Sequence, residues 1–292
     1  MRTRRARSRP PFRVLDQARP QPYVDAVTLL PGPRGSFLEA PEEEIIELLS
    51  RPSTVRSINR PVVSLADGRC VGYQASVRVA ESAVRSATGW FRAAAETGLS
   101  GQLGALALQA ALRERATMPG ERFLAVELDP DAIGHPAVIE VLTAEDDVSD
   151  LIITLISTEP ALGRHSASVL DGFRSRGLLL AAPVGQAGLA DLLAIDRIGP
   201  DLIVLGPALV RNVHREPIQQ RLVDVVVELA DGIGAATLAE EVESLDEARA
   251  MRSGGVRIAQ GWLFGRPRPG FVPPSAEVSA WLRVQHQVTS SG

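Results

Sequence analysis

From residue 41 onward, short apolar runs alternate with longer segments in which apolar residues recur every three or four positions. The short runs have the length of buried strands, and we expect strands at 61–65, 70–79, 122–128, 151–156, 178–183, 202–206, 235–239 and 257–263. The helical periodicity predicts amphipathic helices at 89–97, 101–116, 131–142, 160–175, 187–195, 216–231 and 244–253. A further helix is expected at 41–49, where three glutamates in the first turn complement the helix dipole.

The order of these elements predicts the fold. Ala66-Asp67-Gly68-Arg69 suits a tight hairpin turn, so the first two strands should be antiparallel. The remaining strands are joined by helices, which makes them parallel and buried on both faces. About eight such strands predict an α/β fold, a (β/α)8 barrel whose first strand is antiparallel. An open doubly wound sheet is the alternative, and it is disfavoured because no G-x-G-x-x-G sequence follows an early strand.

The first 40 residues differ in composition from the rest of the chain. They contain eight arginines against three acidic residues, a local net charge of +5, and they are rich in proline. We interpret residues 1–40 as a disordered basic arm, 41–272 as the barrel and 273–292 as a C-terminal helix and tail. The arm either contacts an anionic partner, such as lipid, nucleic acid or an acidic protein, or is a solvated tail.

All 31 basic residues of the chain are arginines, and lysine is absent. This composition excludes a Schiff-base lysine, a P-loop lysine and any mechanism that needs an ε-amine. The net charge of −4 disfavours a general nucleic-acid binder, and 4% aromatic residues are too few for a base-stacking platform. No apolar run reaches the ~18 residues of a membrane span. The single cysteine, Cys70, cannot form an intramolecular disulfide, so we expect a reducing, cytoplasmic environment.

Active residues of such barrels lie at the C-terminal ends of strands, and only two of the expected strand ends carry carboxylates. Glu127 and Asp129 follow one strand, and Glu240 and Glu243 follow another. A cation site usually needs several convergent anionic groups, so we expect no metal and no cofactor. The four histidines also lack metal-binding spacing. Glu127 and Glu240 are either an acid–base pair for hydrolysis or ordinary polar residues at the barrel rim.

Four segments resemble signatures of one family, the EAL domain. They are Pro61-Val-Val-Ser-Leu-Ala-Asp-Gly68, Ala94-Ala-Glu96-Thr-Gly-Leu99, Leu238-Ala-Glu240-Glu-Val-Glu243 and Gln260-Gly-Trp-Leu-Phe-Gly-Arg-Pro267. The family comprises bacterial cyclic di-GMP phosphodiesterases and their inactive relatives. The resemblance extends over about residues 41–272 and implies the family's barrel fold.

The resemblance also implies how active members work, with two divalent cations activating a water that attacks a phosphodiester. The family's metal-binding and catalytic positions that differ here fall on Gln74, Glu127, Thr154, Ala182, Pro183, Val204 and Gly206. The glutamate of the E-A-L motif becomes the amide Gln74, and the catalytic lysine becomes the apolar Val204. Each lost carboxylate removes charge that would offset the cations. These substitutions imply a member without phosphodiesterase activity.

Three family positions are retained, at Arg78, Glu240 and Gln260. Arg78 favours a metal-independent sensor of cyclic di-GMP, because a guanidinium suits bidentate contact with phosphate. Arg60, at the family's glutamine position, and Glu127 oppose nucleotide binding. The candidate nucleotide pocket consists of Gln74, Arg78, Glu127, Glu240, Gln260 and Pro267.

Two classes of function remain open. The first is a non-catalytic EAL-like module of cyclic di-GMP signalling that acts by interaction with an unidentified protein partner, as a nucleotide sensor, or both. The second is a residual or repurposed phosphodiester or glycoside hydrolase that uses Glu127 and Glu240. The resemblance further implies a homodimer through the barrel face at residues 183–190.

Overall fold

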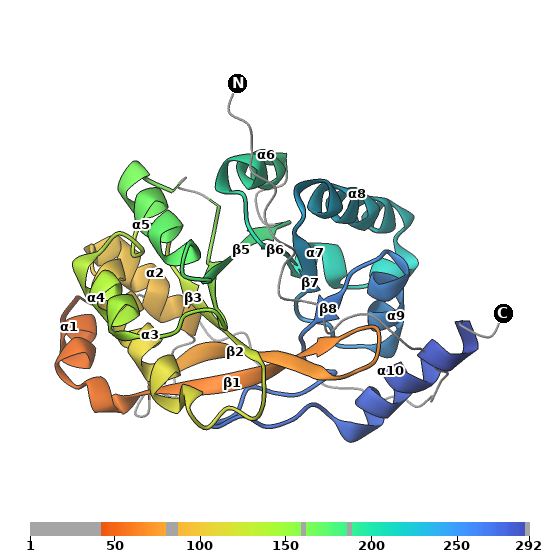
Figure 1. The fold of residues 1–292 in the computed structure, drawn as a ribbon, viewed down its shortest axis with the longest axis horizontal. Helices are drawn as coiled ribbons and strands as arrows, with labels where there is room; N and C mark the ends of the chain where they lie inside the picture. The colour runs from red at the N-terminus through yellow and green to blue at the C-terminus, as the bar shows by residue number, and fades with distance from the viewer. Residues whose placement is uncertain (1–41, 80–86, 159–161, 186–188, 290–292) are drawn as a thin grey trace.

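The computed structural model describes residues 42–79, 87–158, 162–185 and 189–289, and Figure 1 shows their arrangement. The basic arm expected at residues 1–40 lies outside the described residues. Eight strands close into one barrel in the order of the sequence. They are β1 (Val55–Ser64), β2 (Cys70–Val79), β3 (Phe123–Leu128), β4 (Leu151–Leu155), β5 (Leu179–Val184), β6 (Leu202–Leu205), β7 (Ala236–Ala239) and β8 (Ile258–Ala259). β1 is antiparallel to β2 and β8 while the other neighbours are parallel, which confirms the predicted fold.

Helices surround the barrel on its outer side (Figure 1). They are α1 (Glu42–Ser50), η2 (Pro52–Thr54), α2 (Ala87–Thr97), α3 (Ser100–Arg115), α4 (Pro136–Ala144), α5 (Arg164–Arg174), α6 (Leu189–Ile198), α7 (Pro207–Val210), η3 (Val213–Arg215), α8 (Pro217–Ile233), α9 (Leu245–Ser253) and α10 (Ala276–Thr289). Within the described ranges, no helix is long and apolar enough to cross a membrane.

Alternation along the strands produces two apolar layers. One layer fills the barrel lumen with Val62, Phe123, Ala125, Ile152, Ala181, Leu202, Val204, Ala236, Leu238 and Ile258. The other layer, which includes Tyr73 and Ile153, packs outward beneath the helices. At Gly72 an added Cβ would lie 2.5 Å from the Phe123 ring, so this strand position must be glycine for the ring to fit. The lumen is therefore a packed core, as is usual in eight-stranded barrels.

The β1–β2 hairpin extends past β3 at the end of the barrel where β2 finishes. β2 pairs with β3 only over residues 72–75, whereas its pairing with β1 continues to Val79. On the outer side of this extension, Val55 and Val77 are buried with Trp90 of α2 and apolar residues of α1 and α3. This cluster holds the end of the hairpin in place beside the barrel mouth.

Several elements differ in extent from the sequence prediction, among them two strands and one helix described here. β1 begins at Val55 instead of residue 61. Its first half alternates buried residues with exposed or half-buried ones, so it lacks the continuous apolar run that predicted the second half. β8 ends at Ala259 instead of residue 263, because the chain turns at Gly261, where an added Cβ would lie 2.0 Å from the Val242 carbonyl oxygen. The helix predicted at 131–142 begins only at Pro136, after an N-cap residue, His135.

Candidate functional site

Polar side chains gather in the mouth of the barrel, at the carboxyl ends of the parallel strands. Gln74 of β2 is buried, and Glu127 lies near the end of β3. Glu240 and Gln260 directly follow β7 and β8, held by backbone hydrogen bonds to β6 and β7 respectively. Arg60 of β1 lies directly opposite Gln74 in the hairpin. Because residues alternate between the two faces of a strand, Arg60 shares the lumen side of β1 with Val62.

Glu240 and Gln260 are joined by a hydrogen bond. The amide nitrogen Nε2 of Gln260 donates to Oε1 of Glu240 at 2.7 Å. The other amide atom, Oε1 of Gln260, is buried and accepts no hydrogen bond from any described residue. The pair therefore presents an unused acceptor inside the mouth, next to a carboxylate.

Arg60 compensates the two carboxylates electrostatically. Burial raises the pKa of Glu127, and the charge of Arg60 opposes this increase. Burial and then the charge of Glu127 raise the pKa of Glu240 to about 7, whereas Arg60 and the Gln260 hydrogen bond act in the opposite direction. The Nε atom of Arg60 is buried without a hydrogen-bond partner among the described residues. The mouth thus contains one fixed cation and two carboxyl groups with raised pKa values, of which Glu240 titrates near neutral pH.

The donor set of the mouth does not fit the pair of divalent cations that the family resemblance implies. Nowhere in the described ranges do three or more His, Cys, Asp or Glu side chains come close enough to hold a metal ion. Val204 and Pro183, both at strand ends facing the mouth, offer no side-chain ligand. A guanidinium beside Glu127 and Glu240 further opposes a second positive charge there.

The structure brings together four of the six candidate residues of the nucleotide pocket. Gln74, Glu127, Glu240 and Gln260 share the mouth, whereas Arg78 is exposed on the extension of β2. The sixth, Pro267, is half-buried in the segment after β8. That segment returns to the barrel wall, where the backbone of Arg268 pairs with Asn59 of β1. Pro267 therefore adjoins the wall of the barrel at β1, and Arg78 lies at the rim of the barrel.

Two further residues shape the mouth and were not identified from the sequence. From the sequence, Arg60 was interpreted only as a residue that opposes nucleotide binding. Asp191 of α6 is buried and links two loops at the mouth: it accepts hydrogen bonds from Thr158 Oγ1 at 2.5 Å and from the Gly185 backbone at 3.0 Å. Neither residue lies at the C-terminal end of a strand, and the role of each in the mouth depends on which loops and strands the fold places side by side.

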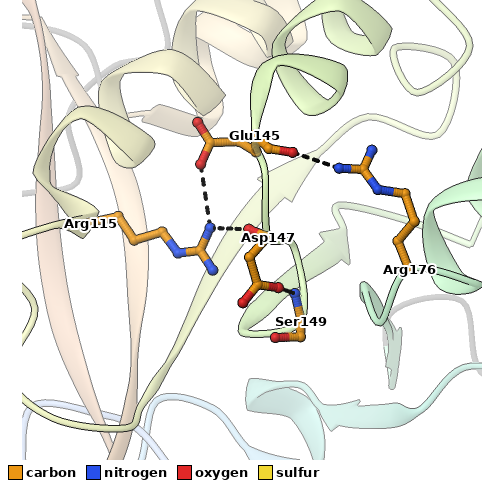
Figure 2. A network of polar contacts seen from close by, with 5 residues as sticks. All are labelled: Arg115, Glu145, Asp147, Ser149 and Arg176. Atoms are coloured by element: carbon orange, nitrogen blue, oxygen red, sulfur yellow. Dashed lines mark hydrogen bonds and ion pairs between the residues drawn. The ribbon is translucent and has the colours of Figure 1, made fainter.

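A second polar network lies away from the mouth, between α3, α4 and β4 (Figure 2). Arg115 contacts Glu145 and donates to the Asp147 carbonyl at 2.6 Å, and Arg176 donates to the Glu145 carbonyl at 2.5 Å. The Asp147 carboxylate accepts from the Ser149 backbone, which lowers its pKa. These contacts fix the loop before β4, at the N-terminal end of the barrel strands, where polar networks generally serve stability. A cavity of about 650 Å³ between α4 and α5 also lies on the outer side of the barrel.

The closed barrel, with its antiparallel first strand, defines a (β/α)8-type protein with a cluster of polar residues at the mouth, where active residues of such barrels lie. The sequence profile of the EAL domain family matches residues 56–267. This chain belongs to the EAL domain family.

Several named proteins are similar to the chain. The cyclic di-GMP phosphodiesterase PdeR of Escherichia coli K12 is 31% identical over 102 residues, which are 35% of this chain and 15% of PdeR. The blue light- and temperature-regulated antirepressor BluF of E. coli K12 is 23% identical over 166 residues, 54% of this chain and 41% of BluF. The structure of Klebsiella pneumoniae BlrP1 with manganese and cyclic di-GMP has a TM-score of 0.65 at 27% identity, covering 74% of this chain and 56% of BlrP1. The chain spans between 15% and 34% of three longer curated relatives, PdeR among them.

Proposed function

We propose that this EAL domain is a non-catalytic module of cyclic di-GMP signalling that acts by binding, either of a protein partner or of the nucleotide without metal. The observation that carries the proposal is the position of Arg60 against Glu127 and Glu240. The guanidinium of Arg60 thus supplies a positive charge that acts on the carboxylates of Glu127 and Glu240 in the mouth. Hydrolysis by two metal ions would need further anionic ligands there, and the described residues do not supply them.

The names of relatives support both modes of binding. BlrP1 is described in complex with cyclic di-GMP, and PdeR is named for the same nucleotide. BluF is named as an antirepressor, a function exerted on another protein. In this chain, Arg78 and the unused Gln260 acceptor support nucleotide binding, because both can contact a ligand without a metal.

The location and assembly of the module belong to the same proposal. We place it in the cytoplasm, on the basis of its single cysteine, Cys70. The barrel face at residues 183–190 is the proposed homodimer surface, and residues 186–188 of it lie outside the described ranges. The basic arm at 1–40 is proposed to contact an anionic partner.

A residual hydrolase remains the second candidate, because one observation favours it. The pKa of Glu240 is raised to about 7 beside Glu127, so one carboxyl group can donate a proton while the other accepts one. Such a pair suits phosphodiester or glycoside hydrolysis without metal. Arg60 lowers the pKa of both Glu127 and Glu240, which weakens the hydrolase hypothesis.

Calorimetry and product analysis with cyclic di-GMP separate these functions. The full chain is titrated with the nucleotide in EDTA and again in magnesium or manganese, and the mixtures are then analysed for the linear dinucleotide. Binding of cyclic di-GMP in EDTA without formation of the linear dinucleotide supports the sensor function. If about 100 µM nucleotide produces no heat, protein interaction is the function that is left. Metal-dependent conversion would contradict the non-catalytic proposal. Metal-independent conversion that Glu240→Gln abolishes would establish the second candidate.

A further inference from the structure

Two arginines face each other at the outer end of the β1–β2 hairpin. The antiparallel register places Arg56 of β1 directly opposite Arg78 of β2. Residues two positions further along each strand, Ile58 and Ser76, are also paired, and beyond them lie Arg60 and Gln74 of the mouth. Because side chains alternate between faces, Arg56 and Arg78 lie on the lumen side, one level above the Ile58–Ser76 pair.

The backbone that carries these arginines is fixed from behind. Their outward-facing neighbours Val55 and Val77 are 2% and 8% exposed, packed against α2 and α3. The arginine side chains, in contrast, are exposed. A rigid wall with two exposed guanidinium groups on its inner side is a preorganised arrangement, because little backbone entropy is lost when a ligand binds.

Neither guanidinium has a counter-ion among the residues that the structure describes. No hydrogen bond or ion pair joins the side chain of Arg56 or Arg78 to a described residue. The two mouth carboxylates, Glu127 and Glu240, interact instead with Arg60, deeper in the lumen. Like charges directly opposite each other on a sheet destabilise the pairing. An anion between the two groups would remove this repulsion and gain charge-assisted hydrogen bonds.

We propose that Arg56 is a second anion-binding residue at the rim of the barrel: opposite Arg78, it completes a subsite in which a phosphate group lies between two guanidiniums without metal. Arg56, which belongs to none of the recognised motifs, supplies half of the site. That the phosphate belongs to a nucleotide rests on the proposed sensor function. The subsite itself follows from the register and from two charges that have no counter-ion among the described residues, and any accessible phosphodiester or pyrophosphate group has the required chemistry.

Pyrophosphate in EDTA tests the subsite directly. Its binding to the full chain is followed by calorimetry and ³¹P NMR at constant ionic strength, for wild type and for Arg56→Gln and Arg78→Gln. Loss of one guanidinium contact should weaken binding about tenfold, the change expected for one charge-assisted hydrogen bond. Arg283→Gln is the matched control, since Arg283 is exposed on α10, beside the hairpin turn at the opposite end of the barrel. Circular dichroism of each variant checks that the fold is retained.

The outcomes separate the subsite from the nucleotide proposal. Equal weakening by Arg56→Gln and Arg78→Gln, with Arg283→Gln unchanged, supports the subsite even if cyclic di-GMP does not bind. Absence of pyrophosphate binding at millimolar concentration overturns it. So does binding that all three variants weaken to the same extent, because net charge alone then explains it. If cyclic di-GMP binds the wild type and Arg56→Gln equally well, Arg56 is not part of the site, while the sensor function stands.

Discussion

Replacing Glu240 by glutamine tests the electrostatic description of the mouth. The pKa of Glu240 rises from an ordinary 4.5 to about 7 in the folded chain. The folded state therefore favours the protonated group: this contribution to stability is fully present below about pH 4.5 and is lost as the pH rises through about 7. The difference corresponds to ~3 kcal/mol at most, at 1.36 kcal/mol for each pH unit. Glutamine is neutral throughout, and its Oε1 can still accept the hydrogen bond of Gln260.

The assay is urea unfolding at pH 5, 6, 7 and 8. We expect Glu240→Gln to match wild type at pH 5 and to exceed its free energy of unfolding by about 1–3 kcal/mol at pH 8. Subtracting wild type from variant at each pH cancels the titration of distant groups. Glu228→Gln, at an exposed position of α8, is the control and should leave the pH dependence unchanged. A difference between variant and wild type that stays constant from pH 5 to pH 8 would refute a perturbed Glu240.

Three other predictions concern the same mouth. Arg60→Gln removes the compensating cation, so the free energy of unfolding should fall by about 3 kcal/mol at pH 8 and by less at pH 5, where Glu240 is protonated; urea unfolding at both pH values measures this. Asp191→Asn brings an amide N–H toward a hydrogen-bond donor and should cost about 1–3 kcal/mol, with faster hydrogen exchange of the Gly185 amide; unchanged exchange would contradict the loop contact. Any anion that binds at the mouth should bind more tightly at pH 6 than at pH 8, because protonated Glu240 repels it less; calorimetry at equal ionic strength decides this.

The barrel could be predicted from the sequence because its signal is repeated. Apolar runs such as 151–156 and 178–183 alternate with helical periodicity, and this alternation is typical of parallel strands that helices bury on both faces. The extent of single elements could not be predicted in the same way. The first half of β1 contains Arg56 and Arg60, which interrupt an apolar run, and it is a strand because α2 and α3 pack against its outer side.

Some residues of the mouth could likewise be predicted from the sequence, and others could not. Gln74, Glu127, Glu240 and Gln260 were identifiable because the carboxyl ends of parallel strands meet at one mouth. Arg56 was not identified, and Arg60 was named only as opposing nucleotide binding, for a topological reason. β1 runs antiparallel to its neighbours, so the beginning of this strand, and not its end, reaches the mouth. A search of C-terminal strand ends therefore omits the strand that carries Arg56 and Arg60.

This topology determines what the mouth can respond to. In a site built around divalent cations, the positive charge leaves and returns with the metal concentration. Here it is the guanidinium of Arg60, attached to a barrel strand and charged at every pH at which proteins fold. The variable charge lies on the carboxyl groups: burial raises the pKa of Glu127, and the pKa of Glu240 is raised to about 7. The electrostatic state of the mouth should therefore depend on pH and on bound anions, and an added divalent cation should change it little.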